Sequence, residues 1–172
     1  MSITQEDNLI IQSYITISFI TELKNNNFLS SDYYKSLNFE NKSVKQLLSK
    51  IEIDNQGTLL LSLYSMLVIP KELLLSKYPK QFKSLNKKIE KLTSKEHSTY
   101  SFDKDQIDYV GHIRNAVAHM RVKFVPNKTV TFEDQNPKNN DVCSITIPLK
   151  KIGILLIELQ KIFNKYIDDL KS

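Results

Sequence analysis

The residues of this sequence best suited to chemistry lie close together, between positions 108 and 119. Arg114 carries a permanent positive charge on a planar fork of donors, which suits a phosphate group. His119 carries an imidazole whose ordinary pKa of about 6.5 lies near working pH, which suits proton transfer. Asn115 adds an amide beside the arginine. Two interpretations of these residues remain open: a site for phosphodiester chemistry, or a buried Arg–His pair that ties helix ends together.

A helix must position these side chains, because apolar residues recur three or four apart through the segment. They are Ile107, Val110, Ile113, Val117 and Met120. Arg114 interrupts this stripe, as is expected at functional or strained sites. The opposite face carries a polar stripe of Asp108, His112, Asn115 and His119. We expect Ser101 or Asp103 to cap this helix and the helix to run to about His119.

The run Arg114-Asn115-Ala116-Val117-Ala118-His119 resembles the Arg-x4-6-His motif of HEPN domains, small α-helical proteins of toxin–antitoxin, phage-defence and RNA-processing systems. A polar residue commonly follows the arginine in that family, and Asn115 fits. The segment 55–72 also resembles the core helix of some plasmid-borne HEPN proteins. The resemblance covers most of the chain, and it is sharpest around the motif.

The resemblance implies a fold and an activity. The fold would be a mainly α, HEPN-like helical bundle with a small antiparallel β-hairpin or meander between the motif helix and the C-terminal helix. The activity would be that of a metal-independent endoribonuclease without a cofactor, acting as a toxin or phage-defence effector. Its Arg and His pairs would meet across a homodimer cleft. The alternative is a non-catalytic HEPN module that binds RNA, a nucleotide or a partner protein.

The same resemblance implies roles for six residues. His119 would be the general acid/base, and Arg114 would stabilise the phosphate. Asn115 would orient the His119 imidazole or the scissile phosphate. Three further residues, His112, Arg121 and Lys123, are expected to bind substrate. No spacing of cysteine and histidine suits a zinc site, so no metal is expected.

One departure from the family concerns its partners. HEPN toxins that are modified by a partner nucleotidyltransferase often carry a tyrosine two residues after the histidine, where this chain has Arg121. That mode of neutralisation is therefore not expected here. The expected partners are RNA, a second copy of the chain, and a cognate antitoxin or regulatory protein of another kind.

The composition places the chain among ordinary globular proteins. Its 172 residues, 41% hydrophobic and 25% charged, predict one domain over residues 1–172. The net charge of +5 favours polyanionic partners, and the only two arginines, Arg114 and Arg121, bracket the motif. A single cysteine, Cys143, is compatible with a reducing compartment. We predict a cytoplasmic protein, because the N-terminal segment is a poor signal peptide and no apolar run is long enough to span a membrane.

The remaining elements follow from periodicity. Helices are predicted at residues 4–24, 43–51, 58–76, 81–92 and 149–170, with the first largely buried and the third broken at Pro70. Strands are predicted at 122–124, 130–132 and 143–147, the first two joined by a turn at 126–128. The polar stretch 93–101, which contains His97, is predicted to be a surface loop.

Overall fold

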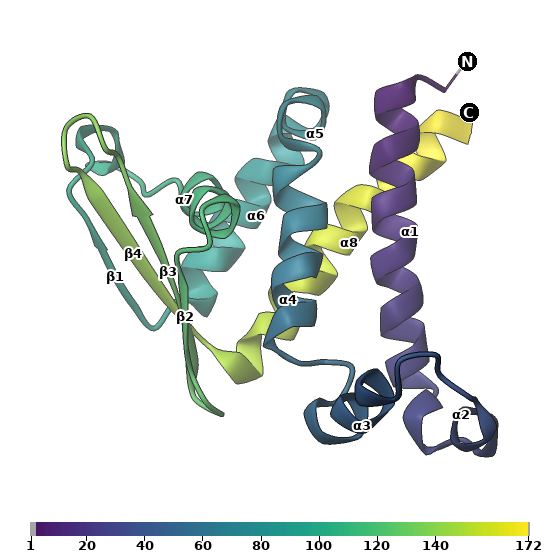
Figure 1. Ribbon diagram of the computed structural model, residues 1–172. Coiled ribbons are helices and arrows are strands. Elements are labelled where there is room, and N and C mark those ends of the chain that lie inside the picture. Colours follow the sequence, from purple (N-terminus) through teal and green to yellow (C-terminus); the bar gives the residue numbers. More distant parts are fainter. Residues whose placement is uncertain (1–2, 172) are drawn as a thin grey trace. The chain divides into compact units, whose positions relative to one another are not determined.

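The computed structural model describes residues 3–171, with the side chains of all but Lys71 and Glu72 (Figure 1). The chain forms two compact units, one of residues 4–62 and one of residues 63–171 together with Ile3. The expected single domain over 1–172 stays a prediction. No helix within the described residues is both long enough and apolar enough to cross a membrane.

The unit of residues 4–62 is helical. It contains α1 (Gln5–Asn25), η1 (Phe28–Ser30), α2 (Asp32–Ser36), α3 (Lys42–Ile51) and α4 (Gln56–Leu63), whose last residue belongs to the other unit. The expected cap of the first helix is confirmed, because the Thr4 hydroxyl accepts from the Asp7 N–H at 3.1 Å. The prediction that this helix is largely buried is wrong, since Leu9, Ile15 and Phe19 are all more than half exposed.

The second unit supplies the helices around the motif. They are the π-helical turn η2 (Tyr64–Val68), α5 (Lys71–Lys77), α6 (Pro79–Leu92), η3 (Ser101–Asp103), α7 (Tyr109–Ala118) and α8 (Leu149–Lys171). The predicted break at Pro70 is confirmed, and Pro79 begins α6 at the position where its missing N–H costs nothing. The π-helical turn before Pro70 was not expected.

The same unit holds a four-stranded antiparallel sheet of β1 (Lys95–Ser98), β2 (Val122–Val125), β3 (Thr129–Gln135) and β4 (Val142–Pro148), in the order β1-β4-β3-β2. The predicted hairpin and third strand are confirmed, with Asn127 left-handed in the turn. The prediction of a loop around His97 is wrong. Lys95–Ser98 has no alternation of apolar and polar residues, and it forms a strand because it pairs with the edge of β4.

Helix α7 lies between the sheet and the other helices of this unit (Figure 1). One face of α7 packs on α6 and η2, and the other packs on β3. Ile113, Ala116 and Val117 are completely or almost completely buried, as are Val130 and Phe132 of β3. The motif helix is therefore covered on two sides. In the middle of its polar stripe His112 and Asn115 face the sheet, whereas Asp108 and His119 at the two ends are exposed. The predicted fold class, mainly α with a small sheet before the C-terminal helix, is confirmed.

Candidate functional site

Helix α7 begins later than expected. Its N-cap is Asp108, whose Oδ1 accepts from the Gly111 N–H at 3.0 Å, and neither Ser101 nor Asp103 caps it. A Cβ at Gly111 would lie 2.2 Å from Asp108 Oδ2, so the glycine leaves room for this carboxylate. Asp103 is consequently available for a different contact.

The C-terminal end of α7 is a Schellman turn. His119 is the C-cap, and Met120 follows it in the left-handed region at φ 55°. The Met120 N–H donates to the Val117 carbonyl at 3.2 Å, and the Arg121 N–H donates to the Ala116 carbonyl at 2.8 Å. This turn stops the helix directly after His119 and leaves the imidazole exposed at the helix end.

His112 is buried between two carboxylates. Its Nε2 lies 2.8 Å from Asp103 Oδ2, its Nδ1 lies 2.7 Å from Asp134 Oδ2, and the residue is only 3% exposed. Each ring nitrogen therefore lies within hydrogen-bonding distance of one carboxylate oxygen. The expected contact between His112 and substrate does not fit this placement, because the ring is inaccessible and both nitrogens are engaged.

Asp134 is the centre of this buried group. Its Oδ2 also accepts from Asn115 Nδ2 at 3.0 Å and from the Tyr100 hydroxyl at 3.2 Å. Burial by itself raises the pKa of Asp134, but the hydrogen bonds from Asn115 and His112 outweigh it and the net pKa lies below the usual value. Burial and the charge of Asp134 raise the pKa of Tyr100 to about 12, so its hydroxyl stays a donor.

Asn115 connects this buried group to Arg114. The Asn115 Oδ1 accepts from Arg114 Nε at 3.3 Å and from Arg114 Nη2 at 3.0 Å, while its amide nitrogen donates to Asp134. The half-buried guanidinium is thus held through Asn115, which Asp134 holds in turn. Among the described residues, the other three of its five N–H groups have no protein acceptor. They are therefore available to an anion.

The structure brings some of the predicted site residues together and leaves others apart. Arg114, Asn115 and His112 belong to one hydrogen-bonded group, whereas His119 makes no side-chain hydrogen bond to any described residue. Arg121 and Lys123 both contact residues of β3. Arg121 Nη1 donates to the Gln135 carbonyl at 3.0 Å, and Lys123 pairs with Glu133 at 2.8 Å. Their expected contact with substrate stays a prediction.

Sequence reasoning missed Asp103, Asp134 and Tyr100 as members of the site. Asp134 continues the buried register of Val130 and Phe132 on β3, so an acid at an apolar position was the available signal. Asp103 and Tyr100 lie before α7 in a segment expected to be loop and helix cap, and nothing in their spacing indicates a contact with His112.

Comparison with known proteins identifies one family. The family model described as HEPN pEK499 p136 matches residues 1–170, nearly the whole chain. No curated protein and no solved structure matches significantly.

Proposed function

Because the chain belongs to the HEPN pEK499 p136 family, we propose that it is a metal-independent endoribonuclease that acts as a toxin or phage-defence effector. HEPN domains are commonly ribonucleases. The observation that carries the proposal is the orientation of Arg114. Asn115 holds its guanidinium, and three of the guanidinium N–H groups have no acceptor among the described residues. A positioned cation with spare donors is what a phosphate in a crowded transition state requires.

The chemistry follows from the two side chains of the motif. His119 removes the proton of a ribose 2′-hydroxyl, and the 2′-oxygen forms a bond to phosphorus while the bond from phosphorus to the 5′-oxygen breaks. The same imidazole then gives the proton to the departing 5′-oxygen, which leaves a 2′,3′-cyclic phosphate and a 5′-hydroxyl. Arg114 binds the charge that builds on the non-bridging oxygens, and Asn115 keeps the guanidinium in place.

The site is composite in this proposal, with Arg114 of one subunit serving the His119 of a second copy. Arg114 and His119 are five positions apart, which places them about 140° apart around a helix axis. Helix α7 is regular up to Ala118, and the His119 N–H still donates to the Asn115 carbonyl at 3.0 Å, so the end of α7 does not remove this offset. A two-fold dimer brings two arginines and two histidines to one cleft, so that each Arg114 can serve the His119 of the other copy.

The experiment is cleavage of end-labelled, mixed-sequence RNA in buffer containing EDTA, with folding verified by circular dichroism in the same buffer. We expect fragments ending in 2′,3′-cyclic phosphate, and a loss of rate of roughly 10²- to 10⁴-fold in His119→Ala. Arg114→Lys keeps the charge but loses the fork, so most of the rate should be lost there as well.

His97→Ala is the matched control, because it removes an exposed imidazole from β1, outside the motif. It should cleave as fast as the unaltered protein. If RNA is bound but remains intact, the chain is a non-catalytic HEPN module. Cleavage at full rate by folded His119→Ala would overturn the assignment of the general acid/base.

A further inference from the structure

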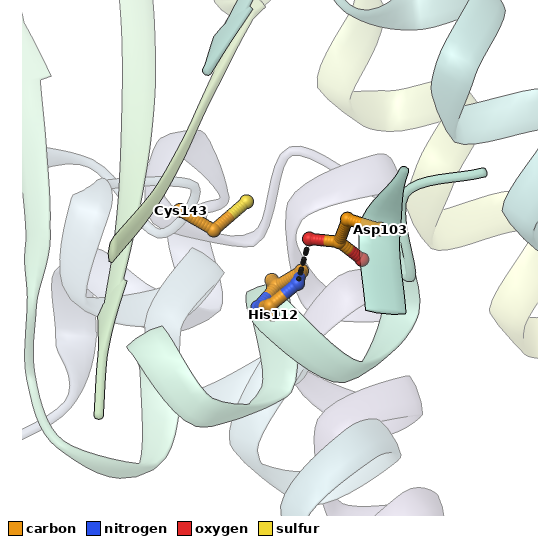
Figure 2. A group of neighbouring side chains, drawn as sticks. All are labelled: Asp103, His112 and Cys143. Carbon is orange, nitrogen blue, oxygen red and sulfur yellow. Dashed lines mark hydrogen bonds and ion pairs between the residues drawn. The ribbon is translucent and has the colours of Figure 1, made fainter. Parts of the chain in front are cut away.

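Three side chains from distant parts of the chain converge beside the buried ring of His112. Figure 2 shows the Cys143 thiol, the Asp103 carboxylate and the His112 imidazole directed toward one another from β4, η3 and α7. One ligand atom from each lies within 4.8 Å of the others, and all three residues are buried. Cysteine, histidine and aspartate are all common zinc ligands in proteins.

The surroundings of His112 match those of a metal ligand. A ligating histidine almost always donates its other ring N–H to a carboxylate, a backbone carbonyl or a water molecule, which fixes the ring. His112 Nδ1 lies 2.7 Å from Asp134 Oδ2, while Nε2 points at Asp103 on the side of the thiol. Asp134 is itself held by Asn115 and Tyr100. The outer contacts of a zinc-bound histidine are therefore already in place.

The Asp103 carboxylate is oriented in the same way. Its Oδ1 accepts from the Asp108 backbone N–H at 3.0 Å, and its Oδ2, the oxygen nearest His112, accepts from the Ser98 hydroxyl. Ser98 is also paired with Cys143 across β1 and β4. Ser98 thus neighbours both Asp103 and Cys143.

We propose that Asp103, His112 and Cys143 form a structural site for one Zn²⁺ ion. The site is separate from the residues proposed to cleave RNA, because its three members are buried, whereas Arg114 is half-buried and His119 is exposed. Zinc bonds of about 2.0 Å to nitrogen and oxygen and about 2.3 Å to sulfur put ligand atoms about 3.5 Å apart. Closing the cluster from within 4.8 Å takes a side-chain movement of about 1 Å.

Zinc binds the thiolate form of cysteine, so binding is coupled to loss of the thiol proton. Burial raises the pKa of the Cys143 thiol to about 12, with the nearby charge of Asp103 adding to the effect, so the thiol is neutral without a metal. Binding of Zn²⁺ therefore releases this proton.

The direct test uses untagged protein from cells grown with added zinc. We expect about one equivalent of Zn²⁺ per chain by elemental analysis, with X-ray absorption showing a single sulfur at about 2.3 Å and nitrogen or oxygen at about 2.0 Å. After removal of zinc, Co²⁺ should give a thiolate-to-metal charge-transfer band in the near ultraviolet. Adding Zn²⁺ should also raise the melting temperature, because the ion binds only the folded chain.

Variants assign the ligands. Cys143→Ser should lose the charge-transfer band, and Asp103→Asn should weaken metal binding at least tenfold, whereas His97→Gln should behave as the unaltered protein. X-ray absorption on the unaltered protein decides the matter if these variants fail to fold. A protein without zinc and without the Co²⁺ band, or zinc bound without sulfur, would leave the cluster a purely hydrogen-bonded one and overturn the proposal. Neither measurement depends on ribonuclease activity.

Discussion

At the scale of single residues, the proposed site depends on how Arg114 is held. An arginine on a surface samples many rotamers, and fixing it costs conformational free energy. Here Asn115 accepts from two nitrogens of the guanidinium and is fixed in turn by Asp134. Part of the ordering needed to bind a phosphate is therefore complete before RNA arrives, which is the benefit of preorganisation.

Asn115→Leu tests the contribution of this amide. The change keeps the side-chain size but removes a donor from the buried Asp134 and both contacts to Arg114, so we expect a loss of about 1–3 kcal/mol in the free energy of unfolding. Urea denaturation measures it. Asn8→Leu is the control, because Asn8 is exposed on α1 and accepts only one long bond, 3.4 Å from Gln12. Equal stability of the two variants would mean that the Asn115 contacts contribute nothing.

At the scale of elements, the end of α7 carries local strain. Met120 sits at φ 55°, where a side chain costs about 1–2 kcal/mol and glycine does not. Because Met120 is 71% exposed, little packing is lost on truncation. Met120→Gly should raise the free energy of unfolding by about 0.5–1 kcal/mol after the entropy of glycine in the unfolded chain is counted.

Met120→Ala is the control for that change. It removes the same exposed thioether but keeps the Cβ that causes the strain, so its stability in urea should stay at or below that of the unaltered protein. If glycine and alanine give the same stability, the left-handed position contributes no strain.

Helices α6 and α8 are linked by an ion pair with a defined pH dependence. Glu158 of α8 bonds Lys161 at 2.7 Å and also Lys88 of α6, and these bonds hold the pKa of Glu158 below its usual value. A carboxyl whose pKa is lower in the folded state stabilises above its unfolded pKa, about 4.3, and loses that effect as pH falls through the folded value. Glu158→Gln should therefore lower the free energy of unfolding by roughly 0.5 kcal/mol above about pH 5, and this difference should vanish at lower pH.

Urea denaturation across a pH series measures this difference. Glu40→Gln, at an exposed acid in the other unit, controls for the change in net charge. A Glu158→Gln deficit that persists unchanged at low pH would show that size or packing, and not the ionised carboxylate, causes it.

Local pattern predicted the elements better than the site. Helical spacing located α7 and α8, and alternation located β2, β3 and β4, because each pattern reflects the burial of one face. Strand β1 escaped prediction because Lys95–Ser98 is polar and takes its conformation from β4. His112 was expected to face substrate because its helix face is polar. Its partners Asp103 and Asp134 come from segments that only the tertiary fold brings to that face.

At the scale of the whole molecule, the proposed activity requires more than one chain. Arg114 and His119 leave α7 in different directions and share no hydrogen bond among the described residues. A two-fold assembly gives each Arg114 the His119 of a partner, so two identical incomplete surfaces become two complete sites. Dimerisation and cleavage should then be lost together on dilution.

Mixing two inactive variants tests the composite site most directly. Arg114→Ala and His119→Ala subunits are combined in equal amounts, allowed to exchange, and assayed on RNA, with light scattering to follow the assembly state. Half of the dimers will be mixed, and each mixed dimer carries one site with both residues intact. The account predicts recovery to about a quarter of the unaltered activity. Mixed dimers no more active than the two variants alone, or an unaltered protein that cleaves as a monomer, would contradict it.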